Sequence, residues 1–235
     1  MTIPFAPAPK DQTCLSGNAL RLYKAEMEAL REAALKGNLK EDDSQGYALF
    51  SDSALRDNEL AVRKYAMAHQ QRVEQVLQSC ARPKDRQVAV WILGYGAQSR
   101  KQIALLVRAS RDEDEIVRNN AIRALGVLAK SNSKIALEIP PNSFIEMLNS
   151  GAWTDRNKAG GLLMALSSNR NPKLLQQLKS AALPSLVEMA KWDPGHAESS
   201  RILLGRIAGL EEARIHQLID SGRVNEILAA VGATP

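Results

Sequence analysis

Few residues in this sequence have the types and spacing that chemistry requires. The three histidines, His69, His196 and His216, are too far apart in the chain for any two to lie on one helical turn. The sequence contains no HExxH motif and no group of closely spaced His and Cys residues that would predict a zinc site. Ligands would have to converge from separate segments, so the sequence predicts no metal and no cofactor.

Motifs for covalent catalysis or nucleotide binding are also missing from the sequence. It has no GxSxG nucleophile motif and no Walker loop. The pair Gly94 and Gly96 follows a predicted helix, whereas a dinucleotide-binding loop follows a strand. The sequence therefore favours a binding protein over an enzyme.

The two cysteines are Cys14 and Cys80, and neither belongs to a CxxC motif. Two cysteines so far apart do not indicate a disulfide framework, and free thiols are the default expectation. The alternative is one bridge that fastens the N-terminal arm to the body in an oxidising compartment.

The segments that must position any site repeat along the chain. Arg86–Gly94 aligns with Arg118–Gly126, and weaker copies are Arg156–Met164 and Ala197–Gly205. The last positions of these copies are spaced by 32, 38 and 41 residues. Spacings near 40 residues are typical of two-helix solenoid repeats. Small residues recur at the glycine position, which predicts that neighbouring helices pack closely there.

These repeats predict an all-α fold, an α-α superhelix of about four to five helical hairpins. We expect a flexible N-terminal arm at 1–17, capping helices at 18–60 and a HEAT-like repeat array at 61–235. Residues 40–46 are predicted to form a polar loop, a helix break is expected near His69, and residues 172–180 and 183–191 are predicted to form separate helices. No hairpin can bury its apolar stripe alone, so stacking supplies the stability.

Composition agrees with closely packed helices. Hydrophobic residues make up 45% of the chain, whereas aromatic residues make up only 4%. The net charge of +5 is mildly basic and is expected of a solvated surface. No apolar run is long enough to span a membrane, and residues 1–9 do not resemble a signal peptide. The expected location is the cytoplasm, with a secreted protein that has lost its leader as the alternative.

One segment resembles a known repeat family. Asp112–Leu128 carries an acidic turn, then Val117-Arg118, then alanine and Leu-Gly at helical spacing. This pattern resembles the HEAT repeats of the bilin-lyase-like type, and the resemblance covers about residues 60–210. It implies that Asp and Arg side chains form a structural ladder between repeats. The ladder residues implied in this way are Arg86, Asp114, Arg118, Asp155 and Arg156.

The same resemblance implies that the second helix of each repeat lines a concave face. Alignment of the repeats places Gln87, Asn119 and Asn157 at one outward position of that face. Trp91 and Arg123 follow one helical turn later, and Trp and Arg dominate binding hot spots. The alternative for Trp91 is that it only caps the core.

The predicted function is a non-catalytic scaffold that binds a protein or peptide on the concave face. The first alternative is DNA binding or a HEAT-like DNA glycosylase, for which Trp153 and Asp155 are the candidate aromatic and carboxylate. The low aromatic content disfavours this nucleic-acid partner, because base stacking depends on such side chains. A bilin-lyase-like accessory protein, suggested only by the family name, is the remaining alternative.

Overall fold

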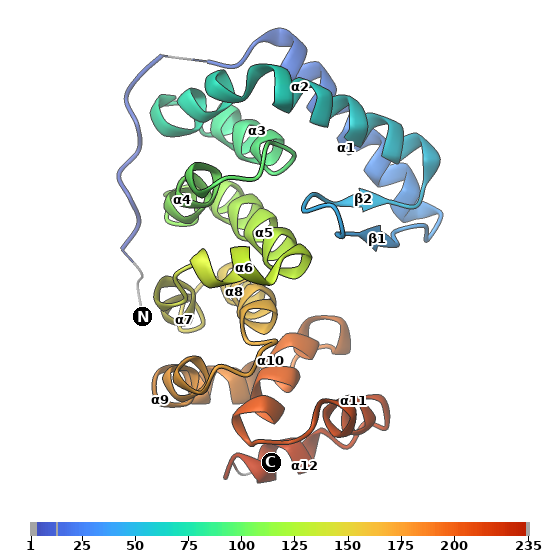
Figure 1. The fold of residues 1–235 in the computed structure, drawn as a ribbon, viewed down its shortest axis with the longest axis vertical. Helices are drawn as coiled ribbons and strands as arrows, with labels where there is room; N and C mark the ends of the chain where they lie inside the picture. Colours follow the sequence, from blue (N-terminus) through green and yellow to red (C-terminus); the bar gives the residue numbers. More distant parts are fainter. Residues whose placement is uncertain (1–3, 13, 234–235) are drawn as a thin grey trace. The chain divides into compact units, whose positions relative to one another are not determined.

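The computed structural model describes residues 4–12 and 14–233, and in these residues the fold is helical with one short β-hairpin (Figure 1). The predicted all-α class is therefore confirmed. In chain order the elements are α1 Gly17–Leu35, β1 Glu41–Asp42, β2 Leu49–Phe50, α2 Ser53–Ser79, α3 Pro83–Leu93, α4 Arg100–Ala109, α5 Glu115–Ser131, α6 Ser133–Glu138, α7 Asn142–Met147, α8 Trp153–Leu166, α9 Pro172–Met189, α10 Pro194–Ile207, α11 Glu212–Asp220 and α12 Val224–Ala230.

The chain forms two compact units, residues 4–139 and 140–233. The first unit contains α1 to α6 and the hairpin. All of its helices except α3 begin where the sequence supplies a capping side chain, because a side-chain oxygen can accept from a backbone N–H that has no partner within the helix. Ser16 caps α1, Asp52 caps α2, Ser99 caps α4 and Asp114 caps α5.

Helix α2 is the long central element of the first unit, and it packs against both α1 and α3. Its backbone leaves helical geometry at His69, where φ is −128° and ψ is 21°. The helix break expected near His69 is therefore confirmed. Buried residues of α2 lie on both sides of the kink, so both parts of the helix pack against neighbouring helices.

The segment predicted as a polar loop at 40–46 begins an antiparallel β-hairpin instead. Glu41 pairs with Phe50, and Asp42 pairs with Leu49. The loop prediction was wrong for residues 41–42, because the apolar anchor lies further along the chain. Ala48 and Leu49 are buried, and their burial pulls the polar half of the hairpin onto the helices.

The N-terminal arm adopts an extended backbone over the described residues 4–12. Ala6 donates its N–H to the Arg111 carbonyl at 2.7 Å, and Asp11 donates to the Ser79 carbonyl at 3.0 Å. The turns before α5 and before α3 therefore each form a hydrogen bond with the arm. The arm is the blue extended coil at the left of Figure 1. The flexibility expected for residues 1–17, with the rest of the proposed domain division, stays a prediction.

The second unit is built from the pairs α7 with α8, α9 with α10, and α11 with α12. Helix α9 is continuous, so the separate helices predicted at 172–180 and 183–191 were wrong. Pro184 lies inside α9, where it has no N–H to donate to the carbonyl of Ser180, four residues earlier. The Asn149 amide donates to the neighbouring Ala181 carbonyl at 3.0 Å, which ties the loop after α7 to α9.

The recurring glycines differ in what surrounds them. A Cβ on Gly205 would lie 2.6 Å from the Ile215 side chain, and one on Gly94 would lie 3.3 Å from Ala124 Cβ. At Gly126 no such neighbour lies within 4 Å. Close packing therefore explains the glycine in two copies of the repeat but not in the third. Among the described residues, no helix has the length and apolar character needed to cross a membrane.

Candidate interaction surface

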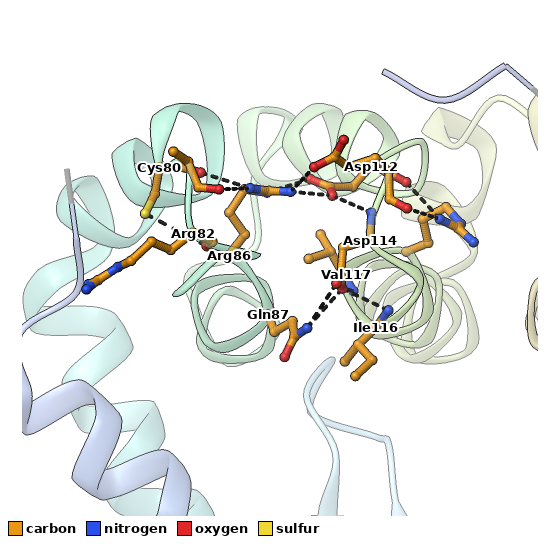
Figure 2. Close-up of polar contacts among 11 residues, drawn as sticks. Cys80, Arg82, Arg86, Gln87, Asp112, Asp114, Ile116 and Val117 are labelled. Atoms are coloured by element: carbon orange, nitrogen blue, oxygen red, sulfur yellow. Dashed lines mark hydrogen bonds and ion pairs between the residues drawn. The ribbon is translucent and has the colours of Figure 1, made fainter. Parts of the chain in front are cut away.

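In the first unit, a network of hydrogen bonds around Arg86 on α3 joins consecutive repeats. Its guanidinium donates from Nε and Nη2 to the Asp112 carboxylate, both at 2.8 Å (Figure 2). Nη1 donates to the carbonyls of Cys80 and Ala81 at 3.0 Å. Arg86 has no exposed surface, so these acceptors offset the cost of burying its charge.

Arg118 on α5 repeats this arrangement one unit along the chain. Its Nη1 donates to the carbonyls of Asp112 and Glu113, which are the sequence equivalents of Cys80 and Ala81. The Arg118 guanidinium also lies 4.0 Å from the centre of the Phe5 ring, so the arm covers this arginine. The backbone acceptors are thus a part of the ladder that Arg86 and Arg118 share.

Asp114 was implied as a ladder residue, but it does not bind Arg86. Its Oδ1 caps α5 by accepting from the N–H groups of Ile116 and Val117, and the carboxylate also accepts from Gln87 Nε2 at 3.0 Å (Figure 2). The ladder carboxylate is Asp112, which the sequence reasoning missed. Asp112 and Asp114 lie in the same acidic turn. Only the relative positions of α3 and α5 determine which of the two carboxylates pairs with Arg86.

The implied ladder residues of the second unit have different partners. Arg156 on α8 pairs with Glu188 at 2.9 Å, and its guanidinium lies 5.0 Å from the centre of the Trp192 ring. Asp155 is buried and accepts from the Ser150 hydroxyl at 3.2 Å. Asn157, the third member of the proposed stripe, lies half-buried on α8.

The pair considered for a glycosylase, Trp153 and Asp155, has divergent surroundings. Trp153 is 45% exposed and contacts Trp192 and His196, with ring centres 5.7 and 4.8 Å away. The Asp155 carboxylate is directed instead into the protein, toward Ser150. The exposed ring and the buried carboxylate therefore do not share one accessible site.

Trp91 and Arg123 are brought together on the first unit, with the guanidinium 5.2 Å from the centre of the indole ring. Both also have partners from the N-terminal region. Trp91 Nε1 donates to Glu26 Oε2 on α1 at 2.9 Å, and Arg123 forms an ion pair with Glu41 of the hairpin. This part of the proposed stripe is therefore partly covered by the chain itself.

A buried acidic cluster lies beneath this covering. Tyr95 Oη lies 2.8 Å from Glu26 Oε1 and 3.4 Å from Glu59 Oε1, and both carboxyl groups are buried. Burial raises the pKa of Glu26 to about 7, against hydrogen bonds from Trp91 and Tyr95 that lower it. Burial also raises the pKa of Glu59. The cluster therefore holds a carboxyl group that changes charge near neutral pH.

The other end of the stripe is open. Gln87 and Asn119 occupy equivalent positions on α3 and α5, and both side chains are half-buried. Asn120 Nδ2 donates to the Gln87 carbonyl at 3.3 Å, which ties the two helices together. A shallow groove of about 560 Å³ borders Gln87; the other residues that line it are Gln12, Ala81, Arg82, Pro83, Lys84 and Asp114. An external ligand can reach this end of the face without displacing the hairpin.

Among the described residues, one cluster has side chains of metal-ligand type. Ligand atoms of Cys14, Cys80 and Asp85 all lie within 4.8 Å of one another. The Asp85 carboxylate already accepts from Arg82 Nε at 2.5 Å, so a cationic group occupies it. The whole of α1, the hairpin and α2 lie between Cys14 and Cys80 in the sequence, so spacing alone gave no signal for this cluster.

Comparison with protein families matches residues 71–158 to the HEAT repeats family. The matched range runs from the last part of α2 to the start of α8, and it includes the Arg86 and Arg118 arrangements on α3 and α5. These residues therefore form HEAT repeats, as the resemblance implied. Comparison with curated proteins gives no match to this sequence.

Solved structures with a similar fold include engineered proteins and designed armadillo repeat proteins. One engineered protein from the Northeast Structural Genomics Consortium is 15% identical with a TM-score of 0.52, covering 92% of this chain and 93% of its own. A second from that consortium is 23% identical with a TM-score of 0.51, covering 76% and 85%. A designed armadillo repeat protein in complex with the peptide (KR)4 is 16% identical, with a TM-score of 0.51 and coverage of 76% and 85%. These similarities confirm the predicted fold of HEAT and armadillo-like type.

Proposed function

We propose that this protein is a non-catalytic scaffold that binds an extended segment of a partner protein on the exposed face of α3 and α5. Repeat folds offer extended surfaces of this kind and need no catalytic residues. The equivalent positions of Gln87 and Asn119, 32 residues apart in sequence, give this face a repeating polar contact. A regularly spaced polar contact suits a ligand whose own backbone is extended and regular.

The observation that carries this proposal is that the same face already holds an extended segment of the chain. The hairpin strand that contains Glu41 lies against α5, where Glu41 pairs with Arg123 and Asp43 pairs with Lys130 at 3.0 Å. Ala48 of the hairpin lines a small hollow together with Trp91 and Arg123. Charge pairing combined with a small apolar contact is a physical basis for peptide recognition.

The uncovered end of the face supplies room for a second segment. The groove beside Gln87 is bordered by the positive side chains of Arg82 and Lys84 and by the Asp114 carboxylate. Charged groups of both signs at the rim favour a particular register of the bound chain, because a shifted register places like charges together. The aliphatic parts of Pro83 and Ala81 add apolar surface at the base.

The designed armadillo repeat protein with a similar fold was crystallised with the peptide (KR)4. The likeness in sequence is too low to transfer that ligand, and the groove beside Gln87 has its own charges. The comparison supports only the general idea that a fold of this type can present a face to a peptide.

The test is selection of binding peptides from a random displayed library on the immobilised full-length protein. Selected peptides are then titrated onto the wild type and onto a Gln87→Lys/Asn119→Lys double variant. We expect affinity to fall about tenfold or more in the double variant, equal to roughly 1.4 kcal/mol. Lysine at position 87 can still pair with Asp114, so the repeat contact is retained.

The matched control is Gln71→Lys, which makes the same change at an exposed position of α2. It should bind the selected peptides as the wild type does, and circular dichroism should show all variants folded. The proposal is contradicted when no peptide is selected, or when the double variant and the wild type bind the selected peptides equally well.

A further inference from the structure

The fold places the only two cysteines of the chain beside each other. Cys14 lies in the N-terminal arm, and Cys80 directly follows helix α2, 66 residues later. Their sulfur atoms lie within 4.8 Å of one another, and both are free thiols. This proximity comes entirely from the docking of the arm, because no local sequence pattern joins the two residues.

Backbone contacts on both sides of the pair hold it in register. Ala81 donates its N–H to the Asp11 carbonyl at 2.7 Å, directly after Cys80 in the chain. Arg72 Nη2 donates to the Cys14 carbonyl at 2.9 Å. A disulfide needs the sulfur atoms at about 2.05 Å, so a shift of at most about 3 Å closes the bond. Cys14 lies outside any helix or strand, so it is the partner that we expect to move.

The two thiols have unequal surroundings. Cys80 is fully buried, whereas Cys14 is partly exposed. Burial raises the pKa of the Cys80 thiol. The Cys80 thiol donates a hydrogen bond to the Asp85 carboxylate at 3.6 Å. An oxidant from solution therefore reaches Cys14 first, and Cys80 is positioned to react second.

We propose that Cys14 and Cys80 are a redox-sensitive pair. A small-molecule disulfide such as oxidised glutathione oxidises them, and they form an intramolecular disulfide bond with each other. The Cys14 thiolate attacks one sulfur of glutathione disulfide, the S–S bond breaks, and one glutathione thiolate leaves. The Cys80 thiol then loses its proton to water, and the thiolate attacks Cys14 Sγ. The bond between Cys14 and glutathione breaks, and the second glutathione leaves as a thiolate. Both cysteines are oxidised, and one glutathione disulfide is reduced to two thiols.

The product is a covalent latch for the N-terminal arm. In the reduced protein the described part of the arm is held near Cys80 by Asp11, which bonds to Ser79 and Ala81. A bond between Cys14 and Cys80 makes the arm permanently part of the first unit. Gln12 lines the groove beside Gln87, so the latch also fixes one wall of that groove. The disulfide itself does not depend on any function of the groove.

Binding of a divalent metal ion is the competing use of the same side chains. Two thiolates and a carboxylate suit zinc. However, the Asp85 carboxylate is ion-paired with Arg82, whose Nη2 lies 2.5 Å from Asp85 Oδ2. A cation would have to displace the guanidinium. The geometry therefore favours the disulfide, and the experiment tests zinc binding as the alternative.

The experiment treats the reduced full-length protein with oxidised glutathione under native conditions. We expect both free thiols to disappear together, and the intact mass to fall by two hydrogen atoms. Peptide mapping without reductant should recover Cys14 joined to Cys80. Amide exchange at Asp11 and Ala81 should slow in the oxidised form, and dithiothreitol should reverse every change.

Two variants keep the result interpretable. In Cys80→Ser, Cys14 should stop at the mixed disulfide and gain one glutathione, whereas in Cys14→Ser the buried Cys80 should remain unmodified. The proposal fails when the wild type accumulates bound glutathione without an internal bridge, forms disulfide-linked dimers, or keeps both thiols free. It also fails when zinc alone binds with one-to-one stoichiometry and protects both thiols, which would assign the cluster to a metal.

Discussion

The Trp91 indole donates a hydrogen bond from Nε1 to the Glu26 carboxylate at 2.9 Å, although 65 residues separate them in sequence. The same carboxylate accepts from Tyr95 Oη at 2.8 Å. This contact joins α1 to α3 and places an ionisable group in the core of the first unit. It also means that the Trp91 ring, proposed for ligand binding, contributes to the packing of the N-terminal helix.

Replacement of Glu26 by glutamine should reduce the dependence of stability on pH. The pKa of Glu26 is raised from 4.5 to about 7 in the folded protein, so the folded state binds a proton more tightly than the unfolded state. The contribution of Glu26 to the free energy of unfolding is fully present below pH 4.5 and is lost as the pH rises to 7. The loss is about 3 kcal/mol, from roughly 1.4 kcal/mol for each pKa unit.

Urea unfolding at pH 5 and pH 8 measures this effect. The wild type should be less stable at pH 8, and Glu26→Gln should lose most of that difference. Glu28→Gln is the control, because Glu28 is exposed on the same helix. An equal pH dependence in Glu26→Gln and the wild type would show that Glu26 is not the titrating group, and would direct attention to Glu59.

Loss of the Arg86 side chain should be strongly destabilising. Arg86→Ala leaves the Asp112 carboxylate, whose side chain is 10% exposed, and two backbone carbonyls without their donor. Breaking one partner of a buried ion pair typically costs about 3–5 kcal/mol. Arg100→Ala removes an exposed ion pair with Glu138 and should cost about 0–1 kcal/mol. Free energies of unfolding that are similar for both variants would argue against the ladder as a major source of stability.

Two glycines at the same repeat position should respond to alanine in opposite directions. Gly205→Ala places a Cβ 2.6 Å from the buried Ile215 side chain, and overpacking of this kind costs about 1–3 kcal/mol. Gly126→Ala meets no neighbour within 4 Å inside helix α5, so the better helix propensity of alanine should stabilise it by about 0.5–1 kcal/mol. Thermal unfolding of both variants is the measurement, and shifts of the same sign would contradict the packing described at these positions.

The ion pair between Arg123 and Glu41 should hold the hairpin on α5. Both side chains are largely buried, with 25% and 28% exposed, so solvent screens the pair less than it screens a surface pair. A double-mutant cycle with Arg123→Met and Glu41→Gln should give a coupling free energy of about 1 kcal/mol.

The exposed pair Lys24–Glu28 provides the comparison for this cycle. Its side chains are 78% and 63% exposed, and a coupling of only about 0.3–0.5 kcal/mol is expected for it. Amide exchange at Ser51, whose N–H donates to the Lys40 carbonyl, reports on the hairpin directly. Unchanged exchange in Arg123→Met would mean that the buried residues Ala48 and Leu49 hold the hairpin without help from the ion pair.

The sequence by itself determined the helical repeats. Apolar residues at helical spacing, capping residues such as Asp114 and the recurrence of Arg86 at Arg118 are local patterns with local physical causes. The kink near His69 could be expected for the same reason. The residues of the proposed stripe were also located on α3, α5 and α8 by alignment of the repeats alone.

The tertiary structure decided which of these residues meet. Asp112 and Asp114 lie in one acidic turn. Only the placement of α3 determines that Arg86 binds Asp112 and that Gln87 binds Asp114. The partners of Trp91 and Arg123, and the approach of Cys14 to Cys80, join segments tens of residues apart. Such contacts depend on how apolar faces distant in sequence pack together, and a repeat pattern read along one chain carries no information about that packing.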